Sequence, residues 1–248
     1  MYPQICKIGP FVIYSYGLML VIAFILSVTL AALFAKRQGF HPDVVYNFGF
    51  TVFIAGVIGA RLFYVIENIN YYLENPLEII LLQHGGLSWF GGLVLGTVFG
   101  LWYLKKKNIP VLKFLDVIIP FVALGHAIGR IGCFLNGCCY GKPSKFGFYF
   151  PAHKAVLIPT QLISVFILLI IFIFLRTLQR RPHHEGQILF AYLFLFSIKR
   201  FFIEFLRADN PQVLWGLTLF QLLSIVVFCI GITGFFMVNK KGRKVTEH

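Results

Sequence analysis

The chain has 248 residues, of which 58% are hydrophobic and only 12% are charged. Soluble domains carry about 25% charged residues, so the composition excludes an ordinary soluble domain and indicates an integral membrane protein. The net charge of +13 is not arranged as basic segments interleaved with aromatic residues. We therefore expect no nucleic acid partner and interpret the charge as a determinant of membrane topology.

Seven apolar segments are each long enough for a membrane-spanning helix, which needs about 20 residues. The first is too long for the apolar core of a signal peptide and follows no basic region, so we predict a retained helix. The third is rich in glycine and could enter the membrane as a broken helix. The sequence predicts an all-α polytopic membrane protein with a single transmembrane domain, residues 1–248, and no large extracytoplasmic head domain. In chain order the segments cover residues 11–35, 45–67, 86–105, 111–138, 157–177, 187–207 and 214–238.

Basic residues concentrate in alternate connections, which predicts the orientation of the chain. The loop 68–85 contains Glu74 and Glu78 but neither lysine nor arginine. The positive-inside rule therefore places the N-terminus outside and the C-terminus in the cytoplasm. The basic residues on the predicted cytoplasmic side are Lys36, Arg37, Lys105, Lys106, Lys107, Lys113, Arg176, Arg180, Arg181, Lys240, Lys241, Arg243 and Lys244. Three residues of the loop 141–156 run against this asymmetry: Lys142, Lys145 and Lys154.

Charged residues inside the predicted spans are the first candidates for a functional site, because such groups normally face a cavity or a partner. The orientation above predicts that all of these charged residues except Lys199 lie in the outer half of the membrane, together with Tyr16 and the glycine-rich motif 85–92. Arg200 and Glu204 can form an i,i+4 ion pair, but the arginines outnumber this acid. The excess positive charge of the arginines suits an anionic ligand such as a phosphate. Arg61 could instead reach the outer interface. These residues are Arg61, Arg130, Lys199, Arg200 and Glu204.

The stretch GHAIGRIGCFLNGCCYG, residues 125–141, follows an apolar run and carries several polar groups. On a helix, His126, Arg130, Cys133 and Gly137 share one face. His126 could be a hydrogen-bonded core residue or a base, and Asn136 could be a helix C-cap or a ligand. A neighbouring stripe of small residues predicts close helix packing, and its members are Gly125, Gly129 and Gly132.

Two further motifs leave alternatives open. The motif HGGLSWFGG (84–92) could be a turn followed by close helix packing, or a backbone that approaches a lipid head group. Cys133, Cys138 and Cys139 have C-x4-C-C spacing, which is not a zinc-binding spacing, so we predict no metal site. These cysteines could pack as small residues, or form a disulfide in an oxidising compartment.

Several stretches occur in an order that is specific when taken together. They are IGPF…YSYGLM (8–19), GARLFYV (59–65), GGLSWFGG (85–92), GRIGCFLNGCCYG (129–141), PTQL (159–162), RFFIEFLRAD (200–209) and GLTLFQLLSI (216–225). In this order the chain resembles the prolipoprotein diacylglyceryl transferase family. The resemblance implies an enzyme of the bacterial cytoplasmic (inner) membrane that performs the first step of lipoprotein maturation. It implies transfer of the diacylglyceryl group of phosphatidylglycerol to the lipobox cysteine of a prolipoprotein signal peptide, without cofactor or metal.

The resemblance also implies roles for individual residues. Arg130 and Arg200 would hold the phosphate and stabilise the departing charge, Glu204 would orient Arg200, and Tyr16 would line the same cavity. His126, one turn before Arg130, is our candidate for the group that assists deprotonation of the attacking thiol, with His84 and the arginine charges as alternatives. We also predict phospholipid contacts from Arg61, Asn136, Gly141, Gly91 and Gly92.

The sequence departs from the family pattern at two positions. Cys133 stands where the family signature has an asparagine, and Phe90 stands where many members have a histidine. The loop between Tyr140 and Pro159 is also short. These departures keep open a divergent paralogue that uses another acceptor or only binds lipid. A non-enzyme alternative is a transporter of an anionic solute, but spans one, five and seven offer almost no polar residues through the inner half.

Overall fold

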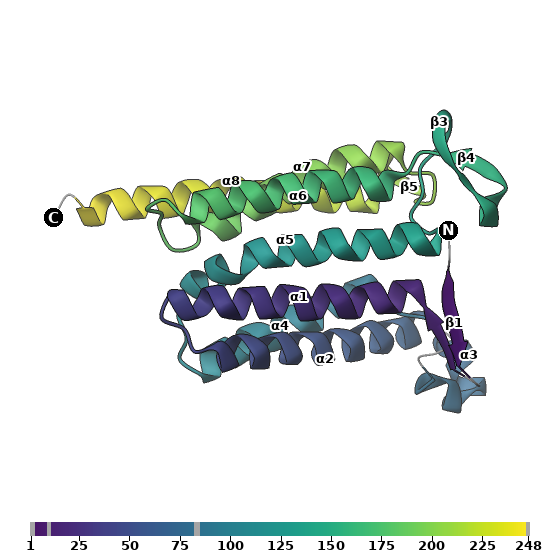
Figure 1. Ribbon diagram of the computed structural model, residues 1–248, viewed down its shortest axis with the longest axis horizontal. Helices are drawn as coiled ribbons and strands as arrows, with labels where there is room; N and C mark the ends of the chain where they lie inside the picture. The colour runs from purple at the N-terminus through teal and green to yellow at the C-terminus, as the bar shows by residue number, and fades with distance from the viewer. Residues whose placement is uncertain (1–2, 9–10, 82–84, 247–248) are drawn as a thin grey trace. The chain divides into compact units, whose positions relative to one another are not determined.

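The computed structural model describes residues 3–8, 11–81 and 85–246 (Figure 1). Its long helices lie where the hydropathy of the sequence predicts spans. They are α1 (Ser15–Arg37), α2 (Pro42–Glu67), α4 (Trp89–Lys106), α5 (Val111–Asn136), α6 (Thr160–Gln179), α7 (Gln187–Leu206) and α8 (Leu219–Thr246). The described residues also include the short helices α3 (Ile69–Glu74), η1 (Pro76–Ile79) and η3 (Pro151–His153).

Five of these helices are long and apolar enough to cross a membrane: α1, α2, α5, α6 and the part of α8 from Leu219 to Lys240. Their outward surfaces carry large exposed apolar side chains, such as Ile58, Phe166 and Phe236. The chain is therefore a mostly helical, polytopic membrane protein. The composition of α4 and α7 is less apolar, because α4 ends in two lysines and α7 contains Lys199, Arg200 and Glu204.

The prediction of an all-α protein holds for the predominant structure, but in the described residues three two-stranded antiparallel sheets accompany the helices. The first predicted span also begins too early, since residues 11–14 form a strand and α1 begins at Ser15. The backbone N–H of Ser15 donates to the Pro3 carbonyl at 2.9 Å, which ties the first hairpin to the helix. The hairpins are β1 (Gln4–Ile8) with β2 (Phe11–Tyr14), β3 (Pro143–Phe150) with β4 (Ala155–Leu157), and β5 (Gln212–Leu214) with β6 (Leu217–Thr218).

The chain divides into two compact units. The larger unit comprises Met1–Ala31 and Leu115–His248, and the smaller unit comprises Ala32–Phe114. In the larger unit, α5, α6, α7 and α8 run alongside one another, with the β3–β4 and β5–β6 hairpins at one end and the C-terminus at the other (Figure 1).

The small-residue stripe of α5 packs against α1, as the sequence predicts. A Cβ atom added at Gly132 would lie 2.9 Å from the Cβ of Met19, and one at Gly125 would lie 2.5 Å from the Ser27 hydroxyl oxygen. Real Cβ atoms do not approach other atoms so closely, so only glycine permits this contact. The stripe thereby positions the last turns of α5, which carry His126 and Arg130.

A buried carboxylate joins the other ends of the larger-unit helices. Asp116 of α5, only 2% exposed, accepts the backbone N–H of Gly186 at 2.6 Å and that of Leu189 at 2.8 Å. It thus caps the N-terminus of α7, whose first N–H groups have no partner within the helix. The amide of Gln179 at the end of α6 donates to the Asp116 carbonyl at 2.8 Å. Three helices are therefore tied together at the end that carries Arg180.

In the smaller unit, glycines let α2 and α4 touch backbone to backbone. A Cβ atom at Gly91 would collide with the Gly59 carbonyl oxygen and with Phe63, and one at Gly92 would lie 3.2 Å from the Gly56 carbonyl oxygen. Of the two interpretations of the GGLSWFGG motif, the second glycine pair thus has the packing role. The phospholipid contact of Gly91 and Gly92 stays a prediction beside this packing.

Candidate active site

The ends of α5 and α7 in the larger unit bring together three of the predicted site residues. Arg200 and Glu204 lie one turn apart on α7, and their side chains are 11% and 0% exposed. Arg130, on the last turns of α5, is half-buried. Arg200 interacts electrostatically with Glu204, Arg207, Arg130 and Cys139, so these groups share one neighbourhood.

Glu204 is held from several directions. Its Oε2 lies 3.1 Å from Nη2 of Arg200, and its Oε1 accepts hydrogen bonds from Asn210 at 2.6 Å and from the Thr218 hydroxyl at 2.9 Å. The Arg200 guanidinium also lies over the Phe220 ring, 4.3 Å from its centroid. The predicted ion pair is therefore present, and the loop after α7 fixes its carboxylate.

Positive charge exceeds negative charge among the side chains described at this end of the unit. Glu204 pairs with Arg200, and its Oε2 also lies 4.0 Å from Nε of Arg207, whose Nε and Nη2 hold Asp209 at 2.8 and 2.6 Å. Lys199 interacts electrostatically with Arg130 and Arg200. We call Arg130, Lys199 and Arg200 the cation cluster. Such an excess of buried charge is costly unless an anion offsets it.

Lys199 is the residue that makes this excess most evident. Lys199 is only 4% exposed, and its Nζ has no hydrogen-bond partner among the residues that the structure describes. The ammonium lies 5.1 Å from the centroid of the Phe196 ring. The sequence identifies Lys199 as an intramembrane cation but predicts no role for it. Its position next to Arg200 in the chain was the one indication that it could share the same site.

His126 lies beside the cation cluster, on the helical face that the sequence predicts. The Nε–H of Arg130 points at Nε2 of His126 at 3.4 Å, and the imidazole ring packs 5.4 Å from the ring of Phe196. The lone pair of Nε2 therefore faces a cation. In this arrangement the histidine orients Arg130, and its use as a base requires that Arg130 move away.

Tyr16 and the loop after α5 lie next to the cluster. Tyr16, at the start of α1, packs against Gly132 and interacts electrostatically with Arg130. Gly141 donates its N–H to the Ile158 carbonyl at 2.9 Å, and an added Cβ would lie 2.7 Å from the Leu206 carbonyl oxygen. Gly141 therefore lets the loop pass close to the end of α7.

Cys133, near the end of α5, forms a compact group with Cys138 and Cys139 of the loop. The side-chain sulfur atoms of Cys133, Cys138 and Cys139 all lie within 4.8 Å of one another, and the Asn136 side chain interacts with Cys138. Hydrogen bonds from the other two thiols, together with the charges of Arg207 and Arg130, lower the pKa of the Cys139 thiol well below its ordinary value.

Arg61, in the smaller unit, is only 6% exposed. Its five N–H donors point at five backbone carbonyls, and its guanidinium lies 5.3 Å from the centroid of the Tyr72 ring. This arrangement engages the guanidinium in organising a loop, and the phospholipid contact of Arg61 stays a prediction. The acceptors are the carbonyl oxygens of Ile79 (2.9 Å), Gly85 (2.5 Å), Gly86 (2.9 Å), Leu81 (3.3 Å) and Glu78.

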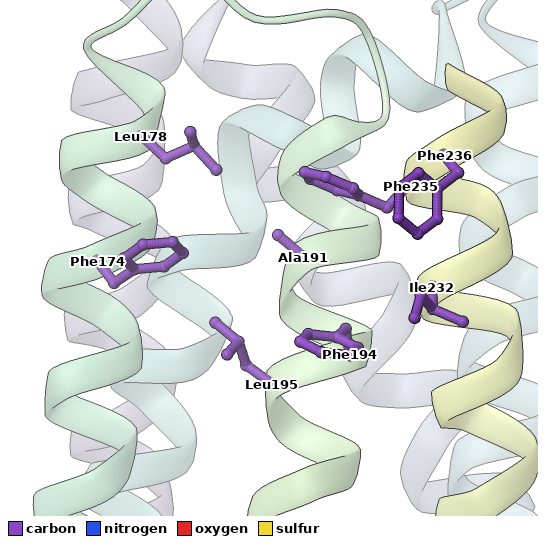
Figure 2. Close-up of a pocket in the computed structure, with 8 residues that line it drawn as sticks. All are labelled: Phe174, Leu178, Ala191, Phe194, Leu195, Ile232, Phe235 and Phe236. Atoms are coloured by element: carbon purple, nitrogen blue, oxygen red, sulfur yellow. The ribbon is translucent and has the colours of Figure 1, made fainter. Parts of the chain in front are cut away.

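Each unit contains a cavity. One, of about 260 Å³, borders the Arg61 loop and is lined by Tyr64, Tyr71, Tyr72, Glu78, Gly85 and Gly86. The other, of about 310 Å³, lies among α6, α7 and α8 and is entirely apolar, so hydrocarbon is what it can hold (Figure 2). It is separated from Glu204 by nine to thirteen residues of α7, or roughly 14–20 Å of helix. Its lining residues are Phe174, Leu178, Ala191, Phe194, Leu195, Ile232, Phe235 and Phe236. The candidate base His84 lies outside the described residues.

Comparison with known proteins identifies the family. The sequence model described as "Prolipoprotein diacylglyceryl transferase" matches residues 3–237. The chain belongs to the prolipoprotein diacylglyceryl transferase family. It is 33% identical to the phosphatidylglycerol–prolipoprotein diacylglyceryl transferase of Clostridium tetani, with 94% of this chain and 96% of the relative covered. The protein of the same name from Clostridioides difficile is 35% identical (92% and 92% covered), and that from Streptococcus uberis is 34% identical (98% and 96%). The resemblance seen in the sequence is thus confirmed.

Proposed function

We propose that this protein transfers the diacylglyceryl group of phosphatidylglycerol to the lipobox cysteine thiol of prolipoproteins, in the bacterial cytoplasmic membrane. The family and the names of the relatives support this reaction. The observation that carries it to particular residues is the cation cluster, where Arg130, Lys199 and Arg200 interact electrostatically and one carboxylate, Glu204, pairs with Arg200. A phosphodiester is an anion that such a cluster can hold.

The reaction requires a thiolate, a carbon centre and a leaving phosphate. The thiolate sulfur forms a C–S bond to the terminal glyceryl carbon of the diacylglyceryl group, and the C–O bond to phosphate breaks. The electron pair of that bond leaves with glycerol phosphate, and the thiol proton passes to a base. Arg130 and Arg200 bind the phosphate oxygens with planar N–H pairs and stabilise the charge that develops on departure. Lys199 supplies a third positive charge.

Other residues position these groups. Glu204 fixes the guanidinium of Arg200 and is itself fixed by Asn210 and Thr218. Tyr16, Asn136 and Gly141 border the place where the head group binds. Arg61, Gly91 and Gly92 belong to the scaffold of the smaller unit, because their backbone contacts already account for them.

His126 is proposed to accept the thiol proton once Arg130 has turned towards the phosphate. Binding of the anion would draw the Arg130 donor away from Nε2, which frees the lone pair. A base of this kind contributes about 10²–10⁴-fold. His126→Ala should therefore lose that factor and the acidic limb of the pH–rate profile. A small loss with an unchanged profile would assign His126 to the orientation of Arg130 alone.

We propose seven spans with the N-terminus outside and the C-terminus in the cytoplasm. The asymmetry of basic residues supports this orientation. Within the larger unit, Arg180 and Arg181 lie at the end of α6, whereas the cation cluster lies at the other end of α7. The cluster then faces the outer half of the membrane, where phosphatidylglycerol can enter sideways. A fluorescent reporter that matures only in the cytoplasm should give signal when fused after Lys244.

A divergent paralogue is the second candidate, because Cys133 and Phe90 replace the asparagine and histidine of the family pattern. The deciding experiment uses the purified full chain in detergent with phosphatidylglycerol and a lipobox peptide. Mass spectrometry should detect a thioether-linked diacylglyceryl peptide, and a lipobox peptide with serine in place of cysteine is the control. Phosphatidylglycerol binding without transfer would favour the paralogue and reject the proposed acceptor.

A further inference from the structure

The three-thiol group at the end of α5 is not needed for the proposed transfer, yet its geometry is specific. Cys133 is buried, Cys138 and Cys139 are half-buried, and their sulfur atoms lie within 4.8 Å of one another. Cys6 and Cys229 are exposed and belong to other segments. Three sulfur ligands from a C-x4-C-C segment can meet only if the chain turns sharply between them.

The loop is built to make that turn. Gly137 and Cys139 both have positive φ, +77° and +61°. A non-glycine residue at such a φ is strained and requires surrounding structure to hold it. That structure comes from α6, because the Thr160 hydroxyl donates to the Cys139 carbonyl and the Gln161 amide donates to the Cys138 carbonyl, each at 2.6 Å. The backbone is thus fixed on both sides of the thiols.

The spacing of the sulfur atoms fits a thiophilic metal ion. A zinc–sulfur bond of about 2.3 Å in tetrahedral geometry places ligand sulfurs about 3.8 Å apart, which is within the separation observed here. Thiolate ligands select soft ions such as Zn²⁺ and Cu⁺. The half-buried side of the group leaves a route by which an ion can reach it.

The surrounding charges also favour a thiolate complex. Three thiolates around a divalent ion carry a net charge of −1. Arg130 and Arg207 both interact electrostatically with Cys139, so they offset that charge. The C-x4-C-C spacing is not a typical zinc-binding spacing, so the sequence alone predicts no metal site. Typical zinc-binding spacings come from loops that turn less tightly than this one.

We propose that Cys133, Cys138 and Cys139 form a site for one soft divalent metal ion, of the Zn²⁺ class, with a fourth position open to water or to the Asn136 side chain. Binding replaces three thiol protons, which pass to solvent, and involves no change of oxidation state. The ion would fix the C-terminal turn of α5. Because Cys133 follows Arg130 by three residues on the same helical face, the site would also hold Arg130 in place.

Metal binding is tested on the reduced, metal-free full chain in detergent. Cd²⁺ serves as the probe, because cadmium–thiolate bonds absorb in the ultraviolet, and Zn²⁺ serves as the competitor. We expect one Cd²⁺ per chain, displacement by Zn²⁺, and protection of three thiols from alkylation. Cys139→Ser should weaken binding by more than about 100-fold, since even partners that only orient ligands are worth 10–100-fold. Cys6→Ser and Cys229→Ser are matched controls that should leave binding unchanged.

The buried Cys133→Ser variant could fail to fold, so Cys139→Ser and Cys138→Ser, at half-buried positions, carry the test with a monodisperse elution profile as the criterion. Cd²⁺ binding that survives in these variants, or that is lost in the Cys6 and Cys229 controls, would overturn the proposal. The cysteine group would instead form a disulfide if the reduced protein takes up no Cd²⁺ and the untreated protein lacks two hydrogens in this group. None of these readouts depends on transferase activity.

Discussion

Two intramembrane arginine environments, one in each unit, show how differently the same side chain can be used. Arg61 directs all five N–H donors at backbone carbonyls of one loop, so its charge is fully engaged in structure. Arg130 and Arg200 have a histidine and a single carboxylate as partners, with an unpartnered Lys199 beside them among the described residues. An intramembrane charge is a functional candidate by default. The inventory of acceptors around it decides whether it is available to a ligand.

The largest expected effect is the loss of activity in Arg130→Ala. Removal of one donor that stabilises a departing anion costs about 10²–10³-fold, and loss of the charge adds to it. Arg130→Lys should not restore activity, because a point charge does not reproduce the planar pair of donors. Rates of peptide modification measure this, with Arg180→Ala, exposed at the other end of the unit, as the control. Near-normal activity in Arg130→Lys would show that only charge matters there.

Arg61→Met should act on stability instead. Hydrogen bonds to charged groups contribute about 1.5–3 kcal/mol each, and unpaired buried carbonyls add a further cost, so we expect a loss above about 3 kcal/mol. At 2–4 °C per kcal/mol for a chain of this length, the melting temperature in detergent should fall by roughly 6–12 °C. The exposed Arg37→Met is the matched control. A variant that melts normally but no longer binds phosphatidylglycerol would place the phosphate at Arg61 and reverse the comparison.

Lys199→Met should have opposite effects on stability and binding. A buried ammonium without a partner costs about 1–3 kcal/mol, so its removal should raise the melting temperature of the lipid-free protein. The same change should weaken phosphatidylglycerol binding by about 10–100-fold, the equivalent of 1.5–3 kcal/mol for one charged contact. Lys113→Met, at an exposed site, controls for loss of net charge. A lower melting temperature would mean that Lys199 has a structural partner.

The smallest effect is expected at the end of the larger unit that lies away from the cluster. Asp116→Asn keeps one acceptor oxygen and loses the other, so α7 should lose about 1 kcal/mol of capping. Transfer activity should stay within a factor of two to three, since the contacts of Asp116 are with the first turn of α7. Thermal melts and rates are compared with the exposed Asp43→Asn. A large loss of activity would couple this end of α7 to the cluster.

The parts of this structure that follow from sequence are those with a strong periodic or compositional signal. Hydropathy located every long helix, and the order of the motifs located Arg130, Arg200 and Glu204. The hairpins were missed because a four-residue apolar strand such as Phe11–Tyr14 merges with the helix that follows it. Hydropathy reports apolar length and carries no information on backbone conformation.

The hydrogen-bond partners of individual polar groups were harder to predict. The acceptors of Arg61 are backbone carbonyls, which have no sequence signature, so its role could not be read from residue types. Asp116 is a single acid in an apolar span, and its two N–H donors come from residues about 70 positions later. The thiol group depends on positive φ angles at Gly137 and Cys139, which spacing rules do not represent.

The most direct test of the central claim is an experimental structure of the full chain with phosphatidylglycerol bound. We predict phosphate oxygens within hydrogen-bond distance, about 3.2 Å, of guanidinium nitrogens of both Arg130 and Arg200, with the Lys199 ammonium directed at the same group. The hydrogen bond between Arg130 and His126 should then be broken. A phosphate bound instead in the cavity lined by Tyr64, Tyr71 and Tyr72, beside Arg61, would contradict the account.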